Sequence, residues 1–245
     1  MMQVFGKTDR GIIREENQDD FAIGTAGEYC WAAVCDGMGG ANGGKVASSM
    51  AAERFKKTVA QFDFRSASSV SIQRMFDSAI TSANVLIYDR ASSDSELEGM
   101  GTTVVAAVVG ASSAYIAHVG DSRAYLISEN EIKRITRDHS VVQTLVDNGT
   151  ITDEEARLHE KKNLITRAVG VDTDVDIEFD EIGVSDGDII LLCSDGLSNM
   201  LTDSEIKDIV LSGENAESRL IEAANAAGGT DNITAVLIMC TKESE

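Results

Sequence analysis

Short runs of apolar residues recur along the chain and predict nine β-strands. Some runs alternate with polar residues, and others are continuously apolar and rich in β-branched side chains. Neighbouring runs, most plainly those between residues 102 and 128, are separated by connections too short for a crossover helix, so the strands should pair antiparallel. The predicted strands span residues 2–8, 20–25, 29–35, 102–109, 113–119, 123–128, 176–182, 188–193 and 233–240.

Apolar residues three and four apart predict six helices between these strands. Val46 and Met50 share one helical face, for example, while Glu53 and Lys57 lie on another. No linker, internal repeat or low-complexity tract divides the chain, so we expect a single domain over residues 1–245 with layered helices and antiparallel sheets. The predicted helices span residues 43–62, 69–92, 138–148, 153–159, 203–211 and 215–227.

Acidic residues dominate the charge of this 245-residue chain, with 41 Asp and Glu against 21 Lys and Arg and a net charge of −20. Nucleic-acid binding needs Lys and Arg to neutralise phosphates, so this balance argues against that partner and favours cations. The amino-terminal residues lack the apolar core of a signal peptide, and we expect a cytoplasmic protein. The cysteines form no CxxC pair and are expected to be buried thiols; they are Cys30, Cys35, Cys193 and Cys240.

The stretch from Met100 to Gly120 has no formally charged residue and is long enough to span a bilayer. Gly110, Ser112 and Ser113 divide it, however, and both halves are rich in β-branched residues. We therefore predict two strands joined by a turn, and no membrane segment.

Aspartates lie where the predicted strands end. Asp36 follows the run YCWAAVC, Asp195 follows IILLCS, and Asp231 precedes ITAVLIM. If strands 188–193 and 233–240 are antiparallel neighbours, Asp195 and Asp231 meet. Each aspartate taken alone also suits an ordinary turn. Together with Asp121 in the turn VGDSR, they would repel by about 1–4 kcal/mol per pair at about 4 Å, a penalty that divalent cations remove.

Six motifs occur in the order REENQDD, VCDGMGG, GMGTT, HVGDSR, LLCSDGL and GTDNIT. This order resembles the type 2C, or PPM, family of metal-dependent protein serine/threonine phosphatases in its compact bacterial form, from about Val4 to Cys240. The resemblance implies an α+β fold, a four-layer α/β/β/α sandwich of two antiparallel sheets flanked by helices. It also implies hydrolysis of phosphoserine and phosphothreonine in proteins by a metal-activated water, opposing a Ser/Thr kinase.

The resemblance assigns metal ligands for two Mn²⁺ or Mg²⁺ ions. Asp36 would bridge the ions, Asp195 and Asp231 would bind the first, and the backbone carbonyl of Gly37 would help to hold the second. Oxygen ligands suit these hard cations. Asp121 corresponds to the ligand of a third, weaker ion.

Two further site residues come from the same resemblance. Arg14 corresponds to the arginine that binds the substrate phosphate. A planar guanidinium suits this role, since it can hold two phosphate oxygens at once. Asp19 matches a position at the metal site that acts through a bound water or from behind the ligands.

The general acid is unassigned. Many eukaryotic members have a histidine two residues after the bridging aspartate, and this chain has Met38 there, which cannot donate a proton. A metal-bound water is the alternative donor. His139 and His159 are expected to have structural roles.

Residues 147–170 resemble the flap of the family, a segment beside the active site that is a candidate for substrate selection. Glu160 replaces a proline that is frequent in relatives, which leaves the local flap conformation open. Lys161, Lys162 and Arg167 would either meet acidic phosphopeptides or form a solvated basic patch. The expected partners are phosphorylated proteins, including a Ser/Thr kinase and its substrates, and the chain is expected to be a monomer.

Two other functions compete with this interpretation. The sequence GGANGGKV resembles a phosphate-binding P-loop, but Val46 stands where a hydroxyl should bind Mg²⁺, and the strands do not alternate with helices. A noncatalytic scaffold that binds phosphoproteins is the second alternative. Turnover of a phosphothreonine peptide would separate an enzyme from a scaffold.

Overall fold

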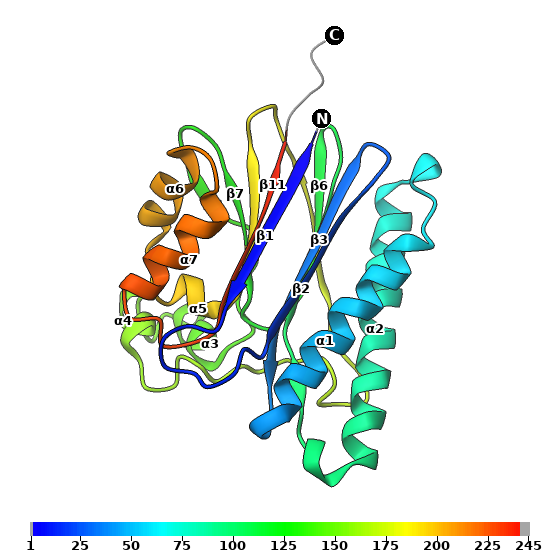
Figure 1. Ribbon diagram of the computed structural model, residues 1–245, viewed down its shortest axis with the longest axis vertical. Coiled ribbons are helices and arrows are strands. Elements are labelled where there is room, and N and C mark those ends of the chain that lie inside the picture. Colours follow the sequence, from blue (N-terminus) through cyan, green and yellow to red (C-terminus); the bar gives the residue numbers. More distant parts are fainter. Residues whose placement is uncertain (1, 241–245) are drawn as a thin grey trace.

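The structure is a computed structural model that describes residues 2–240, except for the side chains of residues 41 and 42. Two antiparallel sheets pack face to face, and helices cover their outer faces (Figure 1). Apolar side chains on both faces of each sheet fix this layering, because each face must be shielded from water. The predicted α+β fold with four layers, α/β/β/α, is confirmed.

The first sheet has the strand order β1-β11-β10-β7-β8. Cys193, at the end of β10, lies opposite Ala235 near the start of β11, so the antiparallel pairing on which the meeting of Asp195 and Asp231 depends is present. Its strands are β1 (Gln3–Asp9), β7 (Arg123–Ile127), β8 (Ile132–Arg134), β10 (Ile189–Cys193) and β11 (Ile233–Met239).

The second sheet has the order β2-β3-β5-β6-β9, and the short strand β4 pairs with the end of β3. The uncharged stretch from Met100 to Gly120 forms the hairpin of β5 and β6, as predicted. No helix within residues 2–240 is long and apolar enough to cross a membrane. The strands are β2 (Asp19–Ala26), β3 (Tyr29–Met38), β4 (Gly101–Thr102), β5 (Val104–Val109), β6 (Ser113–Val119) and β9 (Glu178–Gly183).

Long helices cover the second sheet and shorter ones cover the first, while three small helices lie at the lower left in Figure 1, at the end of the first sheet. The first pair is α1 (Gly40–Ala60) and α2 (Ser69–Ser93). The second pair is α6 (Asp203–Leu211) and α7 (Ala216–Ala226). The small helices are α3 (Val141–Asp147), α4 (Asp153–Leu158) and α5 (Asp195–Ser198).

Three apolar layers separate these elements. Val34 and Leu192 belong to the layer between the sheets, Phe55 and Phe76 to the layer under α1 and α2, and Leu220 to the layer under α7. Each large side chain buried in this way stabilises the fold by about 1.5–3 kcal/mol. All four cysteines are buried and free, as predicted.

Some element boundaries differ from the prediction. The expected strand 102–109 is interrupted at Thr103, where the backbone turns to contact Asp36. The expected helix 138–148 begins only at Val141, because the Ser140 hydroxyl caps it by accepting a hydrogen bond from the Gln143 backbone. The short elements β8 and α5 were not predicted.

Candidate active site

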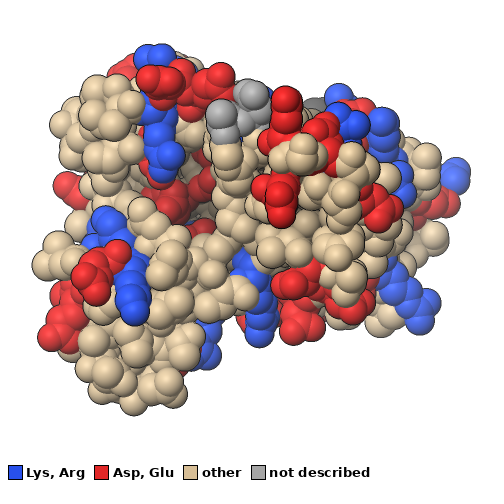
Figure 2. Space-filling view, turned by 90° about the horizontal axis from the view of Figure 1, so that it is seen from below, with Lys and Arg blue, Asp and Glu red and all other residues tan. Residues whose placement is uncertain are grey.

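A cavity of about 300 Å³ opens at the end of the two sheets where the predicted aspartates converge. Figure 2 views the molecule from below and shows acidic side chains gathered in a hollow on this face. Asp36, Asp121, Asp195 and Asp231 all line the cavity, and so do Arg14, Gly37 and Met38. One site therefore contains the predicted residues, apart from Asp19.

Two threonines hold the backbone of Asp36. The Thr103 backbone nitrogen and the Thr102 hydroxyl both donate to the Asp36 carbonyl, at 2.8 and 2.9 Å. The Asp36 nitrogen donates to Thr103 Oγ1 at 3.0 Å, and that hydroxyl lies 2.7 Å from Ser122 Oγ, beside Asp121. The motif GTT thus connects the end of β3, which carries Asp36, to the turn that carries Asp121, a role that its sequence alone did not reveal.

Gly37 allows β3 to approach α1. A Cβ at Gly37 would lie 2.0 Å from the carbonyl oxygen of Gly44 and 2.6 Å from that of Gln18. Close backbone packing therefore excludes a side chain here, in addition to any approach of the Gly37 carbonyl to a ligand.

Asp195 is the first residue of α5. Its Oδ2 accepts a hydrogen bond from Asn199 Nδ2 at 3.0 Å, whereas its buried Oδ1 has no partner. The next residue, Gly196, packs so closely on Asn232 that a Cβ would lie 1.9 Å from the Asn232 carbonyl oxygen. This contact brings the start of α5 against the start of β11 and places Asp195 near Asp231.

Asn232 positions the loop that carries Arg14. Its Nδ2 donates to the carbonyls of Arg10 and Glu16, both at 2.8 Å, and its Oδ1 accepts from the Gln18 backbone at 2.8 Å. Arg14 Nη2 in turn donates to Asp231 Oδ2 at 2.7 Å. The predicted phosphate-binding arginine therefore pairs with a predicted metal ligand.

Asp19 lies behind the cavity and is fully buried. Its Oδ2 accepts hydrogen bonds from Ser194 Oγ at 2.8 Å and Thr234 Oγ1 at 2.6 Å, and its Oδ1 has no partner. Ser194 and Thr234 are the second group of site residues that the sequence did not reveal.

Lost hydration and mutual repulsion raise the pKa values of these carboxyl groups. Burial, followed by the charge of Asp19, raises the pKa of Asp36 well above its usual range. Burial and the charge of Asp231 raise the pKa of Asp195 to about 6. Burial raises the pKa of Asp19 to about 7, although its two hydroxyl donors oppose the shift. Crowded carboxylates with unpartnered buried oxygens are the ligands that a hard divalent cation needs, so the residues fit a metal centre.

The flap contributes Asn163 and Ile165 to the cavity wall. Its basic residues are divided: Lys161 is exposed, Lys162 lines a neighbouring polar cavity of about 370 Å³, and Arg167 pairs with Glu178. They therefore form no single basic patch.

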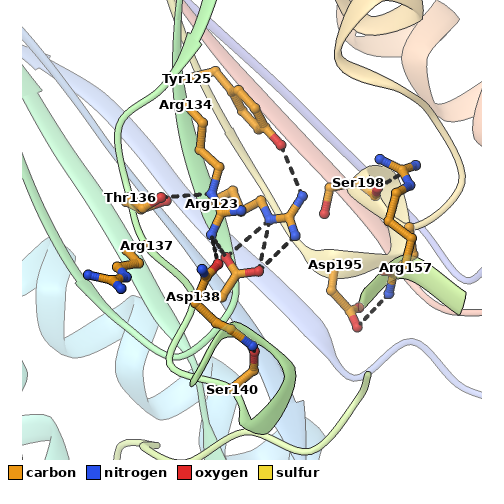
Figure 3. A network of polar contacts seen from close by, with 12 residues as sticks. Arg123, Tyr125, Arg134, Thr136, Arg137, Asp138, Ser140, Arg157, Asp195 and Ser198 are labelled. Atoms are coloured by element: carbon orange, nitrogen blue, oxygen red, sulfur yellow. Dashed lines mark hydrogen bonds and ion pairs between the residues drawn. The ribbon is translucent and has the colours of Figure 1, made fainter. Parts of the chain in front are cut away.

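A network of hydrogen bonds and ion pairs joins residues around the neighbouring cavity (Figure 3). Arg157 of α4 donates to the carbonyls of Ser198 and Leu201, which joins the flap to the end of α5. Among the described residues that line the active-site cavity, none is a histidine, and Met38 stands two residues after Asp36 in the cavity wall.

Comparison with known proteins identifies the family. The protein phosphatase 2C model matches residues 13–235. The chain belongs to the protein phosphatase 2C family. Serine/threonine phosphatase stp of Listeria monocytogenes is 37% identical over 240 residues, which cover 95% of this chain and 93% of that protein. The phosphatase PstP of Mycobacterium tuberculosis is 37% identical across 97% of this chain and 45% of that longer protein.

Solved structures agree with this family. Stp1 from Staphylococcus aureus is 34% identical, covers 98% of this chain and 95% of its own, and superposes with a TM-score of 0.91. The catalytic domain of PstP in complex with two manganese ions is 33% identical, covers 98% of this chain and 99% of its own, and has a TM-score of 0.85. This phosphatase 2C chain is thus a metal-dependent protein serine/threonine phosphatase, as predicted.

Proposed function

We propose that the chain hydrolyses phosphoserine and phosphothreonine in proteins with two Mn²⁺ or Mg²⁺ ions held by Asp36, Asp195 and Asp231 and by the Gly37 carbonyl. The convergence of these carboxylates in one cavity, with Asp195 Oδ1 buried and unpartnered, carries this assignment. When bound, the ions supply an acidified water as nucleophile and shield charge on the phosphoryl oxygens.

Arg14 orients the substrate. Its side chain is half exposed at the rim of the cavity and contacts Asp231 through a single guanidinium nitrogen. With Asp231 engaged as a metal ligand, the guanidinium would be available to hold two phosphate oxygens and so to orient the phosphoryl group for in-line attack.

Asp19 and Asp121 act at the edges of this centre. Asp19 lies behind the cavity, where hydrogen bonds from Ser194 and Thr234 fix its carboxyl group, and so it would orient the ligands from the far side. Asp121 is nearly buried and faces the cavity at the turn after β6, where it would hold a third, weaker ion. Protonation of the leaving alkoxide is assigned to no side chain, because Met38 cannot donate a proton.

The biological setting completes the proposal. The chain would act as a single-domain cytoplasmic monomer on phosphorylated proteins, including a Ser/Thr kinase and the substrates of that kinase. The names of the bacterial relatives support this setting at the level of phosphorylated protein substrates.

Phosphate release from a phosphothreonine peptide tests the activity. We expect release with Mn²⁺, none with excess EDTA, and none from the Asp231→Asn variant with Mn²⁺. Asp208→Asn is the matched control, because it removes an exposed carboxylate of α6 away from the cavity, and it should keep wild-type activity. A wild-type protein that binds Mn²⁺ but releases no phosphate would favour a phosphoprotein-binding scaffold instead.

A further inference from the structure

His139 joins the turn that carries Asp121 to the flap. Its backbone nitrogen donates to the Gly120 carbonyl at 2.9 Å, and the Gly120 nitrogen donates back to His139 Nδ1 at 3.1 Å. On its other side, the His139 carbonyl accepts from the Thr166 nitrogen at 2.7 Å. His139 thus links Gly120, which directly precedes Asp121, to Thr166 in the carboxy-terminal part of the flap, here called its outgoing leg.

The same short ladder sets the flap residues that reach the active site. Ser140 forms an antiparallel bridge with Ile165, and the Val141 nitrogen donates to the Leu164 carbonyl at 2.9 Å. Ile165 and Asn163 line the active-site cavity. Their placement over the cavity therefore depends on where the segment at His139 is held.

The hydrogen bonds of the His139 ring define its protonation. Nδ1 accepts from the Gly120 N–H, so the ring proton lies on Nε2, from which it is donated to Glu178 Oε1 at 3.0 Å. Arg167 Nη1 also donates to Glu178 Oε1 at 3.0 Å, and Arg167 belongs to the outgoing leg of the flap. Burial lowers the pKa of His139, which favours this neutral form.

The hydrogen-bond network around His139 explains the cluster of His118, His139 and Glu178 better than a metal ion does. His118, His139 and Glu178 are close enough together for a metal site. Arg167 Nη1, however, lies 3.2 Å from His139 Nε2 and 3.0 Å from Glu178 Oε1, so a guanidinium already supplies positive charge there. The His118 and His139 rings are also stacked, with their centroids 4.7 Å apart, an arrangement in which their in-plane lone pairs do not converge.

The neighbouring Asp138 fixes the segment in register. It accepts from Arg123 Nε and Nη2, the latter at 2.7 Å, and pairs with Arg134 at 2.6 Å (Figure 3). Arg123 stands two residues after Asp121, and Gly120 directly precedes it. The adjacent residues Asp138 and His139 therefore hold the Asp121 turn on both sides: His139 binds Gly120 before Asp121, and Asp138 binds Arg123 after it.

We propose that His139 is a positioning residue with two separable functions: its Nδ1 holds the Asp121 turn, and its Nε2–H holds the outgoing leg of the flap through Glu178 and Arg167. The inference rests on the proposed role of Asp121 at the metal centre for its first function only. The second function concerns the flap and is independent of metal.

Two substitutions separate these functions. Asn can place its Oδ1 where Nδ1 lies, which keeps the acceptor for Gly120 and loses the donor to Glu178; Gln can keep the donor near Nε2 and lose the acceptor. The first readout is the Mn²⁺ concentration for half-maximal activity on a phosphothreonine peptide. The second is the rate of trypsin cleavage after Lys161 and Lys162 of the flap, measured in EDTA.

We expect a crossed pattern. His139→Gln should raise the half-maximal Mn²⁺ concentration about tenfold, as other changes behind metal ligands do, with flap cleavage within about twofold of wild type. His139→Asn should keep the Mn²⁺ requirement within about twofold and speed flap cleavage about tenfold. Parallel changes in both variants, a reversed pattern, or no change in either would overturn the proposal.

Glu178→Ala provides a second test outside the buried ring, because the Glu178 side chain is 44% exposed. It should speed flap cleavage in EDTA and leave the Mn²⁺ requirement unchanged, and unaltered cleavage would contradict the role of Nε2. An inactive wild-type enzyme would refute the proposed function, whereas the cleavage rates in EDTA would still decide the role of His139 in the flap.

Discussion

Arg14 Nη2 lies 2.7 Å from Asp231 Oδ2, so the guanidinium expected to bind phosphate contacts a carboxylate expected to bind metal. The two roles are compatible because Asp231 would bind a cation in place of the guanidinium, which would leave Arg14 available to phosphate. The Arg14–Asp231 pair therefore links two binding events, because Asp231 would take part in cation binding and Arg14 in phosphate binding.

Replacing Arg14 tests its role in orienting the substrate. Arg14→Ala should lower kcat/KM for a phosphothreonine peptide about 10- to 100-fold, because charge-assisted hydrogen bonds to phosphate are lost. The Mn²⁺ requirement should stay the same or fall, since a competitor for Asp231 is removed. Steady-state kinetics at several Mn²⁺ concentrations measure both effects, and a sharply increased Mn²⁺ requirement would instead make Arg14 a support for metal binding.

Removing one of the two hydroxyl groups that donate to Asp19 tests the support behind the cavity. Thr234→Val keeps the shape of the side chain and deletes the 2.6 Å hydrogen bond to Asp19 Oδ2. We expect the Mn²⁺ dissociation constant to rise about tenfold. Titration calorimetry measures it, and an unchanged constant would show that Asp19 does not act on the metal centre.

Gly37 gives a steric prediction. Gly37→Ala should lower the free energy of unfolding by about 3 kcal/mol or more, because the new Cβ would lie 2.0 Å from the Gly44 carbonyl oxygen. Gly183→Ala is the control, since nothing lies within 4 Å of its added Cβ. Urea unfolding measures both variants, and equal stabilities would contradict the packing described for β3 and α1.

Stability without metal should depend on pH through Asp195. Its pKa is raised to about 6 in the folded state from an ordinary value of 3.8, so between these values the folded protein binds more protons than the unfolded protein. The contribution of Asp195 therefore stabilises the fold at low pH and is lost as the pH rises through about 6. In EDTA, the Tm of the wild type relative to Asp195→Asn should fall from pH 4 to 7. A relative Tm that rises over this range would refute the shift.

The sequence predicted the layered fold and the meeting of the aspartates because both depend on long apolar runs and on which strands are neighbours. Asp195 and Asp231 meet because β10 and β11 are antiparallel neighbours, a pairing that the sequence supplied only as a condition, since three helices separate the two strands along the chain. The four-residue helix α5 and the three-residue strand β8 are too short to show a period.

Contacts across the fold were beyond the sequence pattern. Thr234 reaches Asp19 across 215 positions, and Asn232 holds the loop of Arg14 from 216 and 222 positions away. Nothing local to Thr102, Thr103 or His139 indicates that their polar groups hold the backbone at or beside Asp36 and Asp121. These residues support the site through tertiary contacts, which only the folded chain displays.

Binding of Mn²⁺ to the purified protein tests the central claim most directly, because it requires no knowledge of the substrate. Titration calorimetry should find two Mn²⁺ sites in the wild type and loss of that binding in Asp36→Asn, with the fold retained in its circular dichroism spectrum. An Asp36→Asn variant that binds two Mn²⁺ ions as tightly as the wild type would contradict the account of the converging carboxylates as the metal centre.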